Sequence, residues 1–196
     1  MQKIAPVSLE GHYVRLEPLS LDHLEDLWIS GQDEKIWQYM TIPMKTRDDM
    51  GSFIRTALSN QEEAKEVPFA IIDKQTNRAI GSTRFLNISY KDKGLEIGFT
   101  WLTPSVWKTA VNTECKWLLL RYCFEQLGCI RVQLKTDLRN LNSQRAIARI
   151  GGVKEGILRN HMMLPSGYIR DTVFFSILDS EWPEVNKKLH QILLKK

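Results

Sequence analysis

The sequence predicts a single α+β domain in which helices flank a mixed and mostly antiparallel sheet. The chain has 196 residues, of which 43% are hydrophobic and 26% charged, an ordinary composition for one globular domain with its own core. Stretches that alternate apolar and polar residues, typical of strands, are interrupted by stretches with helical periodicity. One long helix stands between two predicted strands, so the order of elements requires one parallel step in the sheet.

The N-terminal elements are a strand and two helices. Residues 13–20 alternate apolar and polar side chains and form the first strand. Apolar residues at helical spacing predict a helix within residues 20–30, with Asp22 as its cap. Residues 46–61 predict a second helix, because the acidic residues in its first turn complement the positive end of the helix dipole.

Three strands and the long helix follow. Residues 68–74 and 79–89 form a hairpin about a tight turn, and residues 94–102 form the next strand. A polar loop leads from this strand to the long helix, which we expect to begin near Asn112 or Thr113.

The C-terminal third contains two strand-and-helix signals and a tail helix. Residues 130–137 predict a strand, and residues 142–151 predict a short helix that ends at a glycine. Two further strands flank a turn at 165–167. Apolar residues at helical spacing predict an amphipathic helix over 181–196.

Charge and residue spacing disfavour several classes of function. The net charge is +4 with scattered basic residues, which weakly favours an anionic ligand and does not favour a nucleic-acid surface. No apolar run is long enough to span a bilayer and no signal peptide is recognisable, so we expect a cytoplasmic protein without a membrane segment. The four histidines have no ligand spacing, so no metal site is expected. Three cysteines in or beside one apolar segment are expected to be buried as small hydrophobic side chains: Cys115, Cys123 and Cys129.

The loop between strand 94–102 and the long helix carries a functional signal. It brings unpaired backbone N–H groups together at the positive end of a helix dipole, and such an end attracts phosphate. Every strand-to-helix loop shares this property in part, so the loop needs support from other motifs.

Those motifs resemble a known family. They are Glu96-Ile-Gly, a Pro and a Trp before the loop, Thr113-Glu114, Phe-Glu-x-Leu-Gly, Arg-Val, and Asp137-x-x-Asn-x-x-Ser followed by Ile-Gly. Residues 95–161, which contain them, resemble the acetyl-CoA-binding half of the GNAT N-acetyltransferase superfamily. The likeness is to its RimJ/RimL-type branch, which acetylates protein N-termini, and residues 9–27 resemble the opening of that branch.

The resemblance implies the GNAT fold for the whole chain. About residues 1–90 would form the acceptor side and about residues 91–180 the acetyl-CoA-binding side, followed by the C-terminal helix. It also implies acetyl-CoA as the cosubstrate and a homodimer as a common assembly.

The phosphate loop departs from the family pattern, which is approximately Gln/Arg-x-x-Gly-x-Gly/Ala. Trp107, Ala110 and Asn112 stand at those positions, and Lys108 adds a charge. Glycine permits close approach of phosphate and a positive φ, which Ala110 satisfies only in part. Lys108 either pairs with phosphate or is a solvated loop lysine. The resemblance assigns cofactor binding to Trp101, Leu102, Trp107, Lys108, Thr109, Ala110, Val111, Asn112, Thr113, Asn140 and Ser143.

Two residues are candidates for catalysis. Glu96 lies beside the cofactor in the family likeness, where it would take a proton from the amine directly or through water. The alternative is a strand-surface or substrate-orienting glutamate. Ser143 matches a family serine that protonates the departing thiolate, but a serine there also suits a helix cap. Asn140 matches an asparagine that contacts the pantetheine arm, or is a turn residue.

The acceptor pocket is predicted from a segment between helices. Trp37, Tyr39 and Met40 either line an acceptor cleft or pack on the core, as loop aromatics commonly do. His161 lies in the last hairpin and is a candidate substrate contact.

The sequence therefore predicts an N-acetyltransferase that transfers acetyl from acetyl-CoA to a primary amine, foremost a protein N-terminal α-amine, by direct attack in a ternary complex. Two alternatives stay open: a small-molecule amine acetyltransferase acting on polyamines or antibiotics, and a degraded acyl-CoA-binding or regulatory module. Nucleic-acid binding ranks behind both, because exposed aromatic residues do not interleave with the basic ones.

Overall fold

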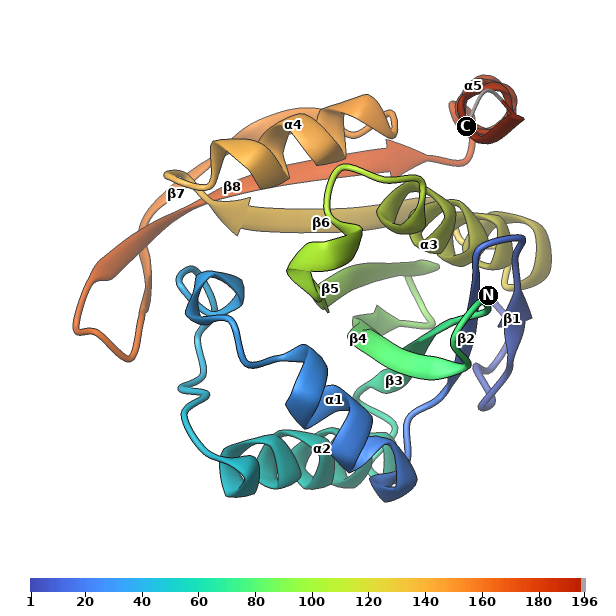
Figure 1. Ribbon diagram of the computed structural model, residues 1–196. Coiled ribbons are helices and arrows are strands. Elements are labelled where there is room, and N and C mark those ends of the chain that lie inside the picture. The colour runs from blue at the N-terminus through green and yellow to red at the C-terminus, as the bar shows by residue number, and fades with distance from the viewer. Residues whose placement is uncertain (195–196) are drawn as a thin grey trace.

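The computed structural model describes residues 1–194 and contains one eight-stranded sheet (Figure 1). The strands are β1 Leu9–Glu10, β2 Val14–Pro18, β3 Val67–Asp73, β4 Arg78–Ser89, β5 Gly94–Leu102, β6 Arg131–Asp137, β7 Val153–Met163 and β8 Ile169–Leu178. The α-helices are α1 Leu24–Ser30, α2 Arg47–Glu62, α3 Val111–Arg121, α4 Leu141–Arg149 and α5 Trp182–Leu194. Short 3-10 turns are η1 Leu21–His23, η2 Glu34–Ile36 and η3 Pro104–Val106, and a π-helical segment, η4 Tyr122–Gln126, continues α3.

The strand order is β1-β2-β3-β4-β5-β6-β8-β7. All neighbouring pairs are antiparallel except β5 and β6, which are parallel and joined through α3. The structure thus confirms the predicted α+β class and its single parallel step. The hairpins predicted for residues 68–89 and around residues 165–167 are present as β3–β4 and β7–β8.

Helices cover both faces of the sheet. One apolar core joins the sheet to α3, α4 and α5, and a second joins it to α1 and α2. In Figure 1, α4 lies above β6 and β8, and α1 and α2 lie below β3 and β4. We call these two sides the α3 face and the α2 face. The three cysteines are buried, as predicted.

The N-terminus differs from the prediction in two details. A short strand, β1, pairs with β2 through Leu9 and Leu16, and two residues are too few to give a periodic signal. The helix at 20–30 begins as η1 with Ser20 as its cap, so the prediction of Asp22 was wrong. The Ser20 backbone N–H donates to His23 Nδ1 at 3.1 Å, so the helix start lies two residues before Asp22.

The caps of α3 and α4 also correct the prediction. α3 begins at Val111 with Ala110 as its cap, so neither Asn112 nor Thr113 caps it. The first turn is held from outside the helix, because Thr109 Oγ1 accepts from the Val111 N–H at 3.3 Å. Asn140, not Ser143, caps α4: its Oδ1 accepts from the Ser143 N–H at 3.0 Å.

The predicted C-terminal helix is α5, described as far as Leu194. Its buried face contains Trp182, Val185 and Leu189, which join the core on the α3 face. Residues 195–196, the end of the predicted helix, lie outside the described residues. Within the described chain, none of the helices combines the length and the apolarity that crossing a bilayer would require.

Candidate active site

Strands β5 and β6 separate in the middle of the sheet. Their parallel pairing runs only from Gly94 opposite Arg131 to Glu96 opposite Gln133. Beyond that point β5 continues to Leu102 beside β4 alone, and β6 continues beside β8 alone. A left-handed residue, Phe99 at φ 49°, marks the register shift of β5 against β4. The separation leaves backbone N–H and C=O groups of the two strands free to pair with an extended ligand.

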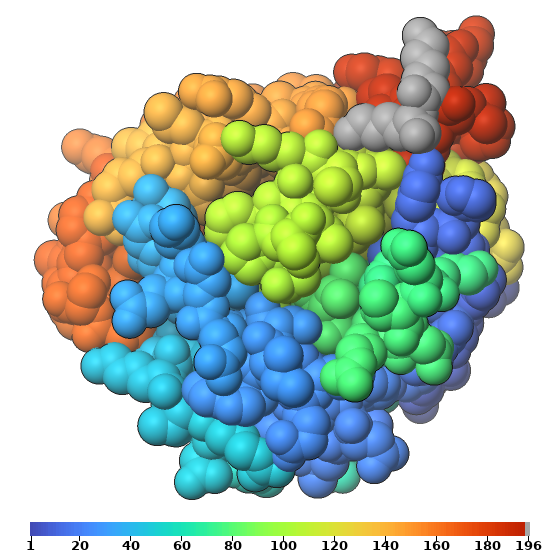
Figure 2. All heavy atoms as spheres, viewed as in Figure 1, coloured from blue at the N-terminus to red at the C-terminus, as the bar shows by residue number. Residues whose placement is uncertain are grey.

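Unpaired amides collect where α3 begins. The Thr109 N–H donates to the Val106 carbonyl at 3.4 Å and the Glu114 N–H to the Ala110 carbonyl at 2.9 Å. The amides of four other residues in this turn find no hydrogen-bond acceptor within residues 1–194: Lys108, Ala110, Asn112 and Thr113. Donors at the positive end of a helix form an anion-binding arrangement. Figure 2 shows a recess between the yellow-green segment before α3 and the orange α4.

One residue of this loop adopts the left-handed backbone conformation that favours glycine, and it is not Ala110. Ala110 has φ −70°, so it is unstrained without glycine. Lys108 instead takes the left-handed conformation, at φ 62°. The positive φ that a glycine would accommodate therefore falls two residues before Ala110, on a charged side chain.

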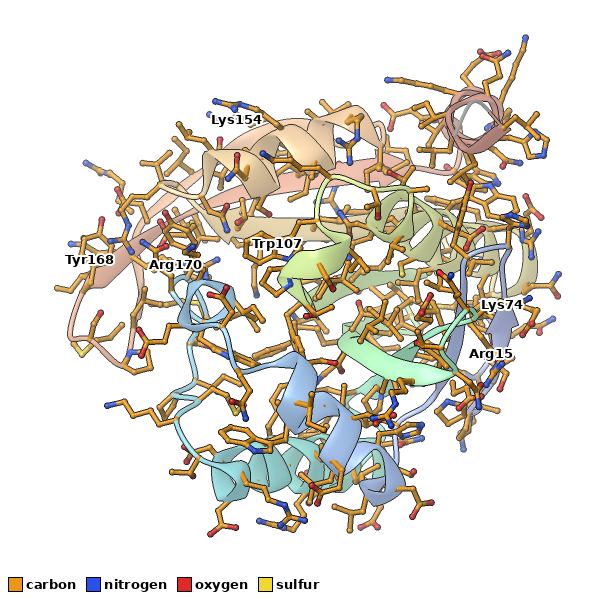
Figure 3. All side chains as sticks on the ribbon, in the orientation of Figure 1. Arg15, Lys74, Trp107, Lys154, Tyr168 and Arg170 are labelled. Carbon is orange, nitrogen blue, oxygen red and sulfur yellow. The ribbon has the colours of Figure 1, made fainter. Side chains whose placement is uncertain are left out.

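Trp107 folds back on the end of β5. Its Nε1 donates to the Leu102 carbonyl at 2.8 Å, and 41% of the side chain is exposed. In Figure 3 it extends from η3 toward the side of the molecule where Arg170 and Tyr168 lie. The indole is anchored at the mouth of the separation between β5 and β6.

Glu96 lies at the point where β5 and β6 part, and it is 1% exposed. Its Oε2 accepts from Asn87 Nδ2 at 2.9 Å and Gln133 Nε2 at 2.8 Å, and Lys135 Nζ is 3.1 Å away. These contacts fix the carboxylate and leave Oε1 as the oxygen without a donor among the described residues. At Gly98 a Cβ would lie 3.0 Å from Oε1, so glycine keeps that side of the carboxylate open.

His161 belongs to the same cluster. Its ring packs edge-on against Phe174 with centroids 5.5 Å apart, and its Nδ1 is buried without a partner in the described chain. Burial, together with the positive charges of Lys135 and Arg170, lowers the pKa of His161, and the charge of Glu96 opposes this shift. The imidazole is therefore neutral at pH 7.

The end of this α2 face is lined by two arginines and two tyrosines. Arg139 stacks on the Tyr168 ring at 3.4 Å and lies 5.6 Å from the Tyr39 ring. Its Nη2 donates to Asp137 Oδ2 at 2.9 Å. Burial by itself would raise the pKa of Asp137. The hydrogen bonds from Arg139 and the charges of Arg139 and Arg170 outweigh burial and lower this pKa. Arg170 Nη1 donates to the Tyr39 carbonyl at 3.3 Å and so ties β8 to the loop before α2.

The remaining residues predicted for the acceptor pocket are placed differently. Trp37 is 8% exposed, its Nε1 donates to the Gly31 carbonyl at 2.7 Å, and its ring lies 5.0 Å from that of Trp101. Met40 also packs on this core. Trp37 and Met40 thus follow the core-packing alternative, whereas Tyr39 lies with the arginines. Trp101 Nε1 is buried and has no acceptor within residues 1–194.

Asn140 and Ser143 lie at the start of α4 on the α3 face, opposite the Glu96 side chain. Ser143 is half-buried, and only its amide is engaged by the Asn140 side chain. The structure brings both near the β6 end of the strand separation, without showing a role in proton transfer.

Several members of this site escaped the sequence prediction: Asn87, Gln133, Lys135, Arg139, Tyr168 and Arg170. Each is an isolated polar residue on a strand or turn, and only the strand register places them on one face. The alternation of β6, which turns Gln133, Lys135 and Asp137 to one side, was the available signal.

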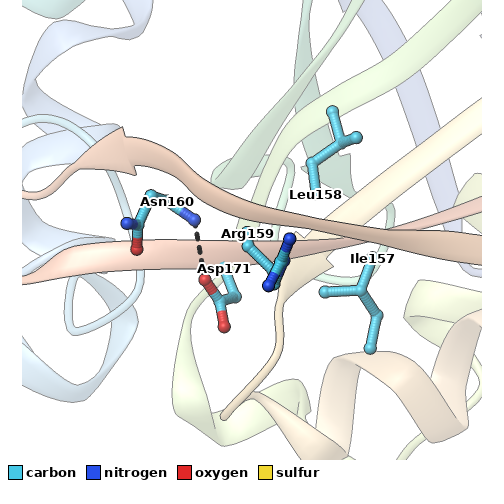
Figure 4. Close-up of a pocket in the computed structure, with 5 residues that line it drawn as sticks. All are labelled: Ile157, Leu158, Arg159, Asn160 and Asp171. Atoms are coloured by element: carbon cyan, nitrogen blue, oxygen red, sulfur yellow. Dashed lines mark hydrogen bonds between the residues drawn. The ribbon is translucent and has the colours of Figure 1, made fainter.

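An open depression of about 670 Å³ lies elsewhere, where the register of β7 and β8 shifts (Figure 4). It is lined by Ile157, Leu158, Arg159, Asn160 and Asp171, and Asp171 Oδ1 accepts from the Asn160 N–H at 2.8 Å. It contains none of the predicted site residues. In the described part of the chain, no group of three or more His, Cys, Asp or Glu side chains has the geometry of a metal site.

Comparisons with known proteins agree with this geometry. Residues 14–153 match the acetyltransferase (GNAT) domain family. The crystal structure of a GCN5-related N-acetyltransferase from Brucella melitensis has a TM-score of 0.91 and 31% identity, covering 98% of this chain and 87% of that chain. A candidate acetyltransferase from T. thermophilus has a TM-score of 0.88 and 36% identity, covering 97% of this chain and 98% of that chain.

A third relative indicates the branch. A candidate ribosomal N-acetyltransferase of Bacillus subtilis (strain 168), YdaF, is 29% identical over 96 residues, which is 49% of this chain and 51% of the relative. Over residues 14–153 and in its whole fold, the chain therefore belongs to the GNAT acetyltransferase family, as an N-acetyltransferase like those of the RimJ/RimL-type branch.

Proposed function

We propose that the protein transfers the acetyl group of acetyl-CoA to a primary amine, most specifically an α-amine at a peptide N-terminus. The observation that carries the cofactor half is the set of four unpaired amides at the start of α3. They would hold the diphosphate, and Lys108 beside them would add a positive charge. The separated edges of β5 and β6 would hold the extended arm that follows.

The acceptor would approach from the α2 face. The carboxylate of Glu96 is fixed by its hydrogen bonds at the last paired residue of β5, where β5 and β6 part. Acetyl-CoA supplies the thioester. As the amine nitrogen bonds to the acetyl carbon, the carbon–sulfur bond breaks, the amine gives a proton to Glu96 Oε1, and the departing thiolate takes up a proton from solvent. His161, a neutral imidazole in the same cluster, is the second candidate for the base.

An α-amine makes small demands on this base. With a reference pKa near 8, about a tenth of such amines are neutral at pH 7, whereas a lysine near 10.4 is neutral about once in 2,500 molecules. The carboxylate of Glu96 therefore suffices as proton acceptor when the acceptor substrate is an N-terminal α-amine. YdaF, named for ribosomal N-acetylation, supports the same class of acceptor.

The test combines binding and turnover. Titration calorimetry should show acetyl-CoA binding to the wild type, and Glu96→Gln should retain that binding while kcat falls about 100-fold or more, because the amine loses its proton acceptor. A matched change at an exposed site, Glu184→Gln on α5, should leave both unchanged.

Two outcomes would contradict the proposal. No heat of binding at millimolar acetyl-CoA would remove the cofactor half and favour a degraded family member. If His161→Gln, and not Glu96→Gln, abolished turnover and the acidic limb of the pH profile, the base would be His161.

A further inference from the structure

Arg170 is a buried cation whose charge no carboxylate satisfies. Its side chain is 7% exposed, and it makes no ion pair with any carboxylate of residues 1–194. Nε donates to Thr172 Oγ1 at 3.0 Å and Nη1 to the Tyr39 carbonyl at 3.3 Å. Two neutral acceptors therefore engage a guanidinium that has five N–H donors. A buried, permanently charged group without a counter-ion is costly unless a ligand supplies one.

The neighbouring charges on the α2 face are already paired. Lys135 Nζ is 3.1 Å from Glu96 Oε2, and Arg139 Nη2 is 2.9 Å from Asp137 Oδ2. Asp137 and Glu96 attract Arg170 from beyond ion-pair distance, and Arg139 repels it. His161 in the same cluster is neutral. The two ion pairs cancel, so Arg170 gives the cluster around Glu96, Lys135, Asp137 and Arg139 a net positive charge.

A positive acceptor face selects among amines. Arginine recognises a carboxylate with two parallel hydrogen bonds, which a lysine cannot reproduce. A polyamine or an aminoglycoside would bring several positive charges against Arg170 and Arg139, a like-charge contact that disfavours binding. The same field favours the neutral form of an incoming amine, which is the form that attacks.

Resting on the proposed function, we propose that the acceptor is an amine that also carries a carboxylate, and that Arg170 binds this carboxylate while Arg139 and Tyr168 form the outer wall. Figure 3 shows Arg170 and Tyr168 on the same side of the sheet, at the β7–β8 hairpin. The carboxylate has two chemical sources: an acidic side chain next to a peptide N-terminus, or the free α-carboxylate of an amino acid or dipeptide.

The first experiment uses the wild-type protein and a panel of acceptors, with CoA release as the readout. Three peptide amides differ only at the second residue: Ser-Glu-Ala-Ala, Ser-Gln-Ala-Ala and Ser-Lys-Ala-Ala. Free serine, the dipeptide Ser-Ala and spermidine complete the panel. We expect kcat/KM for the Glu peptide to exceed that for the Gln peptide about tenfold or more, because a charge-assisted hydrogen bond is gained, with the Lys peptide lowest. Higher rates for serine and Ser-Ala would identify the free carboxylate as the source.

The second experiment assigns the preference to Arg170. Arg170→Gln should reduce the Glu-to-Gln ratio of kcat/KM to about one, because the carboxylate of the Glu peptide loses its charged partner. A merely structural arginine that holds the Tyr39 carbonyl would lower both rates equally and keep the ratio. Arg55→Gln, an exposed arginine on the outer side of α2, is the matched control and should keep the wild-type ratio. If Arg170→Gln does not fold, Arg139→Gln at the exposed wall should lower the ratio in part.

The outcomes separate this inference from the proposed function. Equal rates for the Glu, Gln and Lys peptides, or a preference for spermidine, would overturn the inference and leave the acetyltransferase intact. Absence of transfer to every acceptor from a protein that binds acetyl-CoA would overturn both.

Discussion

Lys116 shows how strongly burial changes the behaviour of one side chain. It lies on α3 at 7% exposure, and its Nζ donates to Thr100 Oγ1 at 2.6 Å. Thr100 Oγ1 in turn lies 2.7 Å from Thr83 Oγ1. Burial lowers the pKa of Lys116 from 10.5 to about 8. No carboxylate of the described residues forms an ion pair with it, so its charge weakens the fold at neutral pH.

We predict that Lys116→Met is more stable than the wild type at pH 7, by about 1–3 kcal/mol, since the penalty for a buried charge disappears. Below pH 8 both the folded and the unfolded wild type are protonated, so the penalty is fully present. Between pH 8 and 10.5 the folded protein releases the proton that the unfolded chain retains, so the wild-type free energy of unfolding rises relative to the variant. Urea unfolding of both proteins at pH 7 and pH 10 measures the difference.

Lys187→Met, at an exposed position of α5, is the control and should show no such pH-dependent difference. A stability gap for Lys116→Met that is equal at the two pH values would contradict the titration of Lys116.

The loop before α3 illustrates what a family pattern misses about a local backbone. The pattern directs attention to Ala110, but the left-handed residue is Lys108, at φ 62°. A left-handed lysine costs about 1 kcal/mol relative to a residue that tolerates this conformation. Retaining a charged side chain there is consistent with a contact to an anionic ligand.

We predict that Lys108→Asn lowers the affinity for acetyl-CoA about 3- to 10-fold without destabilising the protein, because asparagine tolerates positive φ but carries no charge. Calorimetry at low and high salt measures the effect. The wild-type affinity should fall with salt more steeply than that of the variant. Equal affinities for the two proteins at low salt would mean that Lys108 is a solvated loop residue.

Helix starts were the least predictable local features. Thr46 caps α2, accepting from the Asp49 N–H at 3.2 Å, and the acidic first turn of that helix was correctly predicted. Ser20 and Asn140 are the N-terminal caps of η1 and α4, at positions where the sequence had predicted Asp22 and Ser143 as caps. Several polar residues stand within one turn of each start, and the choice depends on where the incoming chain turns.

At the scale of the whole molecule, a buried carboxylate on the central helix α3 joins that helix to the first hairpin, β1–β2. The carboxylate of Glu114 is 2% exposed and accepts the backbone N–H groups of His12, Tyr13 and Val14 at 2.7, 2.7 and 2.8 Å. A Cβ on Gly11 would lie 2.5 Å from this carboxylate, so glycine is required for the close approach. The family motif Thr113-Glu114 thus has a structural role at its second residue.

We predict that Glu114→Gln lowers the free energy of unfolding by about 2–4 kcal/mol, because an amide NH₂ would face backbone donors at a buried site. Urea unfolding followed by tryptophan fluorescence measures the change, with Glu184→Gln as the exposed control. A loss no larger than that of the control would show that the hairpin is held by its apolar contacts alone.

The sequence by itself determined the fold class, most strand and helix positions, the acetyltransferase family and the loop that begins α3. These follow from periodicity and from motifs that are local in the chain. The roles of Glu96 and His161 as site residues stay predictions, whereas Trp37, also predicted for the acceptor pocket, lies in the core. Only the tertiary structure decided which polar residues share a face. Asn87, Gln133, Lys135 and Arg170 come from three different strands, β4, β6 and β8, and strand register alone, set by long-range pairing, places them on the same face of the sheet as Glu96.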